Sequence, residues 1–306
     1  MSAIVDRILE KLGDKELVNK LLSLPKSDLN SLLLDIHKKQ SDNITPANVL
    51  KSYEANRFSV PSEINPVEYH RFQVEILDIA QGIGINSILL SPAAPFASCS
   101  AFGCVDQNNV VSATRGAEIL ADPTNMLAII IADGLKRKKI NNQPPIHYCT
   151  TARVLRAQPF PKVKGYSSHF GLFCVVSSGK DGGSYSCERE LLLKHLQCYR
   201  KLVVEKYSAE FSVILGKRRG YTDGDGFFEC MAELIKSELP NVRISYDFDS
   251  EDNNYYKGIS FKLCMTRGGN AVEIGDGGFT DWVTQMTGNS KERCLTSAIG
   301  VDRLLM

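Results

Sequence analysis

The sequence has no long apolar run and no apolar leader. Its longest apolar stretches are short, such as Met126–Ala132, whereas a membrane-spanning helix needs about 20 such residues. The first segment, Met1–Leu12, is amphipathic and carries Asp6, Arg7 and Glu10, whereas a signal peptide has an uninterrupted apolar core. We therefore expect a cytoplasmic protein with no secretory leader and no membrane-spanning helix.

Paired cysteine motifs are also missing. The nine cysteines include no C-x-x-C pair, and their odd number, without a leader, favours reduced thiols over disulfides. Cys99 and Cys104 are the closest two, and no histidine lies near them in the sequence. Because a zinc site combines closely spaced cysteine and histidine ligands, we expect no metal site built from protein residues.

The chain has little excess of charge of either sign. It contains 36 Lys and Arg against 35 Asp and Glu, a formal net charge of +1. This balance excludes a protein that holds nucleic acid mainly by bulk charge, although a local basic face is compatible with it. With 306 residues, 43% of them hydrophobic, the chain has the length of one large domain or two ordinary ones.

Several common nucleotide and hydrolase motifs are absent. Gly82 and Gly84 lack the third glycine of a dinucleotide-binding fingerprint. Gly179-Lys180 is followed by Asp181, whereas a phosphate-binding P-loop requires Ser or Thr there. No G-x-S-x-G elbow occurs, and no two histidines stand at i and i+4. These absences argue against serine-elbow hydrolases and zinc proteases.

The first sixty residues have the pattern of short helices. Breaks occur at Gly13 and around Ser23–Lys26, and Pro46–Ala55 reads as a further helix. Pro61 and Pro66 then bracket a linker. We expect residues 1–62 to form a helical appendage and residues 63–306 to form one domain.

From Pro66 onward the pattern alternates between helix and strand. Asp122-Pro123 is a good helix start, because Asp caps free backbone N–H groups and Pro suits the first turn. The expected helices are 66–82, 123–139, one carrying Leu192 to Val203 and one carrying Phe227 to Leu234, and the expected strands are 87–91 (buried), 146–154, 170–176, 211–215, 242–248, 258–265 and 271–274. Because most strands come late, we expect an α+β fold with an antiparallel sheet flanked by helices.

Three segments in this order carry a family resemblance. They are the helix from Pro66 with Ser87–Pro92; Thr151–Gln158 followed after a loop by His169–Phe173; and Gly275–Trp282 followed by Leu295–Leu304. Together they resemble the three signatures of class II aminoacyl-tRNA synthetases. The resemblance is greatest to histidyl-tRNA synthetase and its paralogue, the regulatory subunit of ATP phosphoribosyltransferase. It covers residues 66–306 and implies the class II synthetase-like fold.

The resemblance implies an ATP site. Binding ATP for attack at its α-phosphate requires cations on the phosphates and an aromatic ring beside the adenine. Arg156 matches the arginine that clamps the α-phosphate and is the candidate catalytic residue; Phe170 matches the adenine-stacking aromatic, and Arg303 the arginine on the far phosphate. The full implied ATP-binding set is Arg156, Gln158, His169, Phe170, Gly300 and Arg303. The alternative for both arginines is an ordinary place on a charged surface.

The resemblance also implies a pocket for a small molecule. Asp122 and Thr124 fall on the family's segment before its cap helix, and Asp122 could contact an amino group, although helix capping explains it equally well. Tyr255 and Tyr256 match the family's tyrosine pair. Glycines 277 and 278 allow a close approach to the backbone. We assign these six residues to the small-molecule pocket.

The departures from the family pattern bear on its activity. Gln158 stands where the family has Glu, and Leu172 and Val176 stand where polar residues are expected. Loop cations remain only as Lys162 and Lys164, and Glu251 occupies the position of a catalytic arginine. A pocket built on hydrogen bonds discriminates poorly without its polar groups. We therefore expect no full histidyl-tRNA synthetase activity.

Two functions follow from the resemblance. The first is a free-standing paralogue that binds ATP with Mg²⁺ and activates a small carboxylate as an adenylate. The alternative is a non-catalytic regulatory or binding subunit. The Pro66–Pro92 segment, which forms the family's subunit interface, implies a homodimer. The chain stops three residues after Arg303, so we expect no anticodon-binding domain and no tRNA partner.

Overall fold

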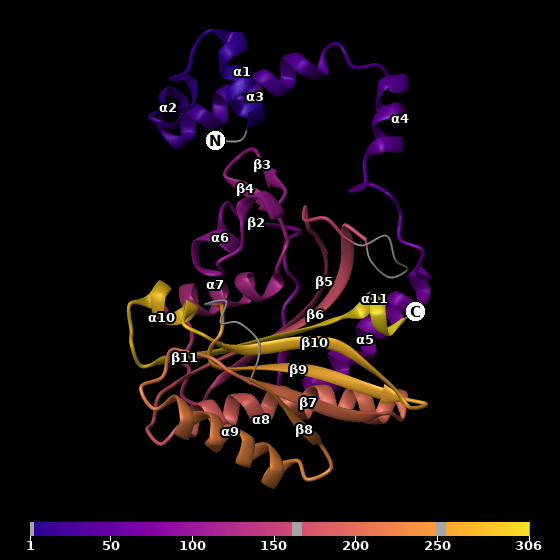
Figure 1. Cartoon of the computed structure of the whole chain (residues 1–306), viewed down its shortest axis with the longest axis vertical. Helices are drawn as coiled ribbons and strands as arrows, with labels where there is room; N and C mark the ends of the chain where they lie inside the picture. Colours follow the sequence, from indigo (N-terminus) through magenta and orange to yellow (C-terminus); the bar gives the residue numbers. More distant parts are fainter. Residues whose placement is uncertain (1–2, 161–166, 249–254, 306) are drawn as a thin grey trace.

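A mixed β-sheet crosses the centre of the molecule (Figure 1). The computed structural model describes residues 3–160, 167–248 and 255–305. Within them, the larger sheet has the strand order β1-β5-β6-β11-β10-β9-β7-β8. These strands are β1 (Asn86–Ser87), β5 (Ile146–Leu155), β6 (His169–Lys180), β7 (Glu210–Lys217), β8 (Arg243–Asp247), β9 (Lys257–Arg267), β10 (Asn270–Thr280) and β11 (Glu292–Gly300).

The inner part of the sheet is antiparallel, as the sequence predicts. From β5 through β6, β11, β10 and β9 to β7, each strand is antiparallel to the next. Only the two edge strands are parallel to their partners, β1 to β5 and β8 to β7. The predicted α+β class with helices flanking the sheet is confirmed.

The predicted buried strand over residues 87–91 is wrong. Strand β1 covers only Asn86 and Ser87, both exposed, and Leu89 is 94% exposed. The reason lies in the position of β1 at the sheet edge, where it pairs with β5 on one side only. Beyond Ser87, Ile88 and Leu90 are partly buried against the core under α7, whereas Leu89 points to solvent.

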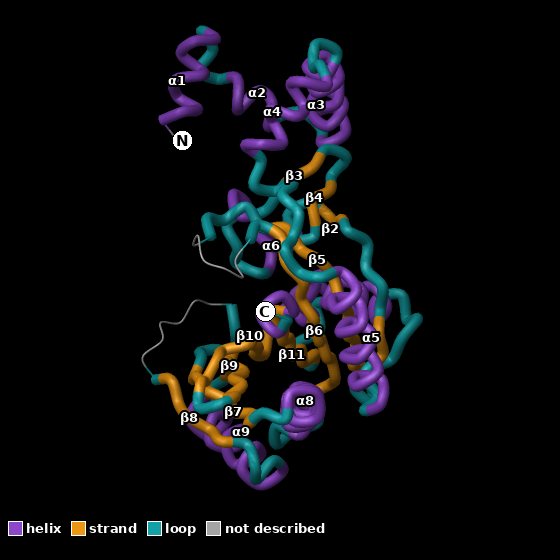
Figure 2. The backbone as a smooth tube through the Cα atoms, turned by 90° about the vertical axis from the view of Figure 1, so that its right-hand side faces the viewer, coloured by secondary structure: helices purple, strands orange, loops and turns teal. Residues whose placement is uncertain are grey.

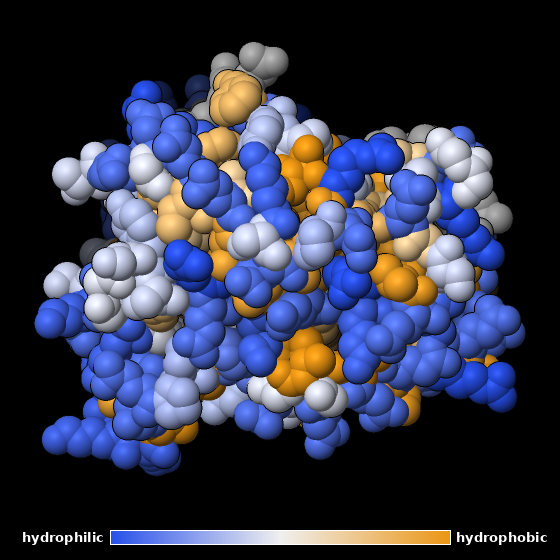
Figure 3. Space-filling view, turned by 90° about the horizontal axis from the view of Figure 1, so that it is seen from below, coloured by the Kyte–Doolittle hydropathy of each residue, from blue (hydrophilic) through white to orange (hydrophobic). Residues whose placement is uncertain are grey.

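Three helices cover one face of the sheet: α5 (Pro66–Gly82), α8 (Ser186–Lys201) and α9 (Gly224–Glu238). Helix α5 begins where the sequence predicts, because the Asn65 side chain accepts hydrogen bonds from the backbone N–H groups of Val67 and Glu68. A short π-helical turn, η2 (Leu202–Lys206), extends α8. Seen from the side of α8 and α9, the outer surface is mainly hydrophilic, with scattered hydrophobic areas (Figure 3).

The opposite face of the sheet packs against α7 (Pro123–Lys136) and α10 (Trp282–Thr287). Strand β6 shows the division: Phe173 and Val175 join the core under α8, whereas Cys174 and Val176 join the core under α7. This alternation follows from the two-residue period of a strand. Val176 is fully buried among apolar side chains. An apolar residue therefore suits this position, where the family pattern has a polar one.

A smaller unit lies beside α7. It contains a three-stranded sheet, β2 (Ala93–Pro95), β4 (Ala117–Ile119) and β3 (Ser112–Ala113), with the short helices α6 (Ser98–Phe102) and η1 (Gln107–Asn109). Glu118 is its buried centre, and its carboxylate accepts hydrogen bonds from Ala97 N, Ser98 Oγ and Gln107 Nε2 at 2.7–3.0 Å.

The N-terminal region is helical, as expected. Its helices are α1 (Ala3–Leu12), α2 (Leu17–Leu22), α3 (Lys26–Ser41) and α4 (Pro46–Ala55). They lie at one end of the molecule, away from the large sheet (Figure 2). In these helices only Leu9 is buried, so most of their apolar side chains face solvent. No described helix is long and apolar enough to cross a membrane.

A buried polar chain links β5, β6, β11 and α8. The His195 ring nitrogens are 2.8 Å from Ser177 Oγ and 2.7 Å from Ser297 Oγ, and His147 Nδ1 is 2.7 Å from Ser177 Oγ. Tyr199 completes the chain through its hydroxyl, 2.8 Å from Ser297 Oγ. Burial lowers the pKa of His147 to about 4 and lowers the pKa of His195 well below 6.5.

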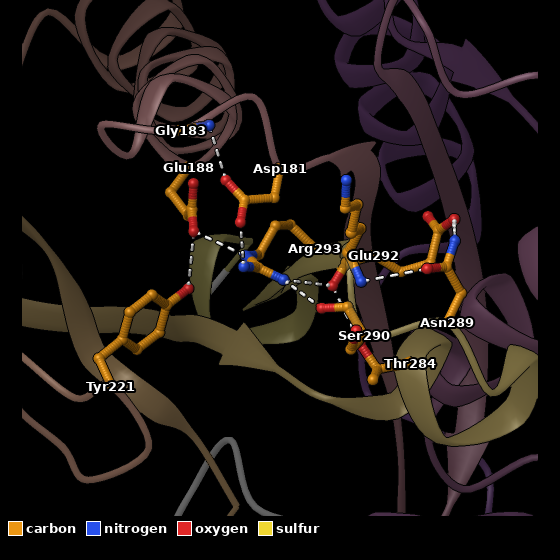
Figure 4. A network of polar contacts seen from close by, with 10 residues as sticks. Asp181, Gly183, Glu188, Tyr221, Thr284, Asn289, Ser290, Glu292 and Arg293 are labelled. Carbon is orange, nitrogen blue, oxygen red and sulfur yellow. Dashed lines mark hydrogen bonds and ion pairs between the residues drawn. The ribbon is translucent and has the colours of Figure 1, made fainter.

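An ion-pair network ties the start of β11 to α8 (Figure 4). Arg293 Nε donates to Glu188 Oε1 at 2.8 Å, and Arg293 Nη2 donates to Asp181 Oδ2 at 2.7 Å. The Tyr221 hydroxyl donates to the same Glu188 oxygen at 3.1 Å. Because the Glu188 side chain is only 1% exposed, Arg293 supplies the charge that allows this carboxylate to be buried.

We predict that the free energy of unfolding decreases as the pH falls. An unfolded histidine takes up a proton near pH 6.5, whereas folded His147 and His195 resist protonation. The contribution of these two histidines to the free energy of unfolding is therefore fully present above pH 6.5 and is lost as the pH falls towards 4. Going from pH 7.5 to 5.5 should cost about 1.4 kcal/mol for each histidine, measured by urea unfolding.

The variant His195→Gln should lose about half of this histidine contribution to the pH dependence. His37→Gln, at an exposed position on α3, is the control and should keep the pH dependence of the parent. An unchanged pH dependence in His195→Gln would contradict the assignment.

We also predict that Arg293→Met destabilises the protein by about 3–5 kcal/mol, because it leaves the buried Glu188 carboxylate without its cation. Adding Glu188→Gln should recover part of the loss, since the buried charge is then gone. The exposed pair Arg137–Asp133 gives the control: Arg137→Met should cost less than about 1 kcal/mol. Unfolding free energies in urea measure all three, and equal losses at Arg293 and Arg137 would refute the prediction.

Candidate functional site

A cavity of about 730 Å³ opens above the central strands, on the face of the sheet opposite α8. Its floor comes from β6, β9, β10 and β11, and its walls come from the start of α7, the segment after β5 and the helix α11 (Val301–Leu304). Nine predicted site residues line it: Asp122, Thr124, Arg156, Gln158, Phe170, Tyr255, Tyr256, Gly300 and Arg303. Residues far apart in the sequence thus meet in one pocket of ligand size.

Arg156 lies directly after β5 and faces Phe170. Its Nε donates to Ala121 O at 2.9 Å, and its guanidinium carbon is 5.3 Å from the centre of the Phe170 ring. Among the described residues, no carboxylate forms an ion pair with Arg156. An arginine held by a carbonyl and a ring, with no ion-pair partner among the described residues, is suited to bind an anion.

Arg303 enters the cavity from α11, where it follows Gly300 at the end of β11. Its Nη1 donates to Glu273 O at 3.5 Å, and its side chain is exposed. A Cβ on Gly300 would meet only the aliphatic carbons of Arg303, at 3.6 Å or more. These are ordinary van der Waals distances, so a small side chain would fit at this position.

The other part of the cavity is acidic and aromatic. Asp122 caps α7 through a hydrogen bond from Thr124 N at 2.9 Å, and it also accepts one from the Tyr255 hydroxyl at 3.1 Å. The capping role is thus confirmed, and the carboxylate lines the cavity as well. Burial raises the pKa of Tyr255 well above 10, so its hydroxyl keeps its proton and acts as a donor.

Asp276 lines the same part of the cavity, although the sequence analysis did not single it out. The Tyr256 hydroxyl donates to Asp276 Oδ1 at 2.6 Å. Burial, with a smaller contribution from the charge of Asp122, raises the pKa of Asp276, while the Tyr256 hydrogen bond lowers it. The signal in the sequence is an acid between two glycines, Gly275-Asp276-Gly277, in the middle of a strand.

Three predicted site residues do not line the cavity. His169 turns towards the linker: its Nε2 is 2.6 Å from Val60 O, and its Nδ1 is 2.8 Å from Arg153 Nη2. Gly277 and Gly278 lie in β10 below the cavity surface. A Cβ on Gly278 would come within 2.5 Å of the Tyr256 ring. The group that lies against the backbone of Gly278 is therefore this tyrosine.

The linker after α4 contacts the segment that follows β5. Arg57 donates to Gln158 O at 3.0 Å and to Ser168 Oγ at 2.8 Å, and it also bonds to Ala157 O. With the contact of His169 to Val60, these bonds fix the linker against one wall of the cavity. Nothing in the sequence pattern indicated this contact.

Some predicted positions lie outside the described residues. They are Lys162, Lys164 and Glu251. Over residues 3–160, 167–248 and 255–305, no group of three or more His, Cys, Asp or Glu side chains is placed to hold a metal ion. All nine cysteines are free, and eight of them are at least partly buried. Cys99, which lines the cavity, has its pKa raised to about 12 by burial.

Known proteins share this fold at low sequence identity. No protein-family model and no curated protein matches the sequence. A structure of an ATP phosphoribosyltransferase regulatory subunit/histidyl-tRNA synthetase from Bacillus halodurans C matches with a TM-score of 0.60 and 14% identity over 82% of each chain. Histidyl-tRNA synthetase from S. aureus matches with a TM-score of 0.58 and 13% identity, over 81% of this chain and 69% of that one.

A third structure, of a threonyl-tRNA synthetase from Aeropyrum pernix, matches with a TM-score of 0.57 and 15% identity, over 78% of this chain and 58% of that one. At such identities the likeness establishes the architecture alone. It agrees with the family resemblance that the three sequence segments indicated. The chain therefore has the fold of the catalytic domain of class II aminoacyl-tRNA synthetases.

Proposed function

We propose that this protein binds ATP, with Mg²⁺, in the cavity and activates the carboxylate of a small molecule as an adenylate. One observation carries the proposal. A single cavity combines Arg156 beside Phe170, with no ion-pair partner among the described residues, and an acidic and aromatic part around Asp122 and Tyr255. The first part suits a nucleotide, and the second suits a molecule with an amino group.

The reaction requires little covalent chemistry from the protein. A carboxylate oxygen of the small molecule attacks the α-phosphorus of ATP, the bond to the bridging oxygen breaks, and pyrophosphate leaves. Arg156 would hold the α-phosphate and offset the charge that develops there, while Phe170 would stack on the adenine and Arg303 would bind the distal phosphates. Bound Mg²⁺ would supply further positive charge at the phosphates.

The small molecule is not expected to be histidine. In the family, polar groups read the amino acid from the positions of Leu172 and Val176, and here Leu172 lines the cavity while Val176 is buried in the apolar core. A site without those partners discriminates poorly. Pyrophosphate exchange into ATP across a panel of amino acids tests the activity, and ATP binding without exchange by any member would favour the regulatory alternative.

We also propose a homodimer formed through the segment Pro66–Pro92. Three apolar side chains of this segment are exposed among charged ones: Val67 is 55%, Val74 is 59% and Leu89 is 94% exposed. Because β1 is an edge strand, a second copy could cover these side chains by a two-fold, isologous contact.

We expect no tRNA partner. Nine free cysteines suit a reducing compartment such as the cytoplasm.

For the nucleotide, we predict that Arg303→Ala weakens ATP binding at least about tenfold, since it removes a charge-assisted contact to the distal phosphates. Binding of AMP, which lacks those phosphates, should change less than about twofold. Titration calorimetry measures both nucleotides. Arg189→Ala, at an exposed position on α8 outside the cavity, is the matched control.

Equal losses for ATP and AMP in Arg303→Ala would contradict the role given to this arginine. If the parent protein binds no ATP at all, the nucleotide proposal itself is wrong.

For the dimer, we predict that Leu89→Asp converts the protein into a monomer at micromolar concentration. A carboxylate buried in an apolar interface costs several kcal/mol. Leu22→Asp is the control, because Leu22 is 70% exposed on α2, outside the proposed interface. Sedimentation velocity distinguishes the two states, and a monomeric parent or a dimeric Leu89→Asp variant would disprove the interface.

A further inference from the structure

Helix α11, which carries Arg303, is a single turn that the rest of the chain holds in place. It contains only four residues, Val301–Leu304, and Gly300 before it has no side chain to cap it. One turn is too short to be stable by itself, because helix nucleation is unfavourable. Arg303 is its exposed residue, whereas the other three residues are buried. The direction of the arginine is therefore set by how those three are anchored.

Asp302 is the polar anchor of this turn. Its Oδ1 accepts a hydrogen bond from Gly171 N at 2.7 Å, and its side chain is 6% exposed. Strand β11 pairs with β6 only as far as Gly300 and Leu172, so Gly171 lies just beyond the last strand pair. The Asp302 carboxylate supplies the acceptor that this buried N–H requires. Because hydrogen bonds are directional and apolar burial is not, Asp302 fixes the orientation of the turn as well as its position.

Asp302 also reaches the residue before Phe170. Its Oδ2 is 3.3 Å from Arg153 Nη2, and the same nitrogen donates to His169 O at 3.2 Å. His169 precedes Phe170 in β6, and Gly171 follows it. The carboxylate thus holds the backbone on both sides of Phe170, directly at Gly171 and through Arg153 at His169.

The two residues that Asp302 holds are those assigned to opposite ends of ATP. Phe170 is the candidate for the adenine, and Arg303, next to Asp302 in the chain, is the candidate for the distal phosphates. All three line the cavity. A nucleotide occupies both positions at once only if their separation matches its length, and the second contact then forms at a high effective concentration.

We propose that Asp302 is a positioning residue of the nucleotide site, which sets the separation of Phe170 and Arg303 by holding α11 against β6. The inference rests on the proposed binding of ATP in this cavity. Asp302 itself needs no contact with the nucleotide, because both of its oxygens face protein donors. Its effect is large for a ligand that spans both residues and small for a ligand that reaches only one of them.

The test compares ATP, which spans both residues, with AMP, which lacks the distal phosphates. Asp302→Asn keeps the shape of the side chain but places an amide N–H₂ group against one of the two donors, Gly171 N or Arg153. By titration calorimetry on the full chain, it should weaken ATP binding about tenfold and AMP binding less than about threefold. Asp181→Asn is the matched control, because Asp181 also pairs with an arginine but lies outside the cavity, and it should keep the parent affinities.

A double-mutant cycle separates positioning from a general structural role. In Arg303→Ala the separation no longer matters, so adding Asp302→Asn should weaken ATP binding less than about threefold. Equal ATP losses in the parent and in Arg303→Ala would overturn the inference. Should Asp302→Asn fail to fold, Arg153→Met replaces it in the cycle, since it keeps the bond to Gly171 N, and the same pattern with a smaller ATP loss is expected.

Parent-like ATP binding in Asp302→Asn, or equal losses for ATP and AMP, would also overturn the inference. These results differ from failure of the proposed function. If the parent protein binds no ATP, the nucleotide proposal is wrong, and the role given to Asp302 is wrong with it. If the parent binds ATP and only the variants disagree, the nucleotide proposal holds and the positioning role alone is wrong.

Discussion

The cavity depends on how closely the strands approach one another at β10. On the buried face, a Cβ at Gly275 would come within 2.0 Å of Ala298 O, and one at Gly277 within 2.5 Å of the Phe261 ring. On the cavity face, Gly278 receives the Tyr256 ring. Only residues without a side chain fit at these positions. Because glycines flank Asp276 on β10, neighbouring strands approach closely, and the Asp276 side chain lines the cavity.

The cavity contains side chains of both charge signs. Arg156 and Arg303 come from the ends of β5 and β11, whereas Asp122 and Asp276 come from the start of α7 and the middle of β10. The sheet and helices fix these positions independently of any ligand, so little reorganisation is needed on binding. The same preorganisation explains why a chain with a net charge near zero can still present a strongly polar site.

The N-terminal region is connected to the site by more than its covalent linker. Arg57 bonds to Gln158 and Ser168, and His169 bonds to Val60. These contacts lie on the segments before and after residues 161–166, next to the predicted nucleotide position. The family resemblance assigned His169 to the ATP site. In the structure both of its ring nitrogens contact protein atoms instead, one of them in the linker.

Neighbouring residues along the chain are enough to predict the helix starts, the buried faces of the central strands and the order of the three segments. Helix capping at Asn65-Pro66 and Asp122-Pro123 depends only on residues next to one another in the sequence, and so does the alternation along β6. Helix starts and buried faces could therefore be predicted. Three features depend on the folded chain: β1 lies at a sheet edge, His169 faces the linker and Asp276 lines the cavity. Each of these depends on a partner distant in the sequence, which no local pattern specifies.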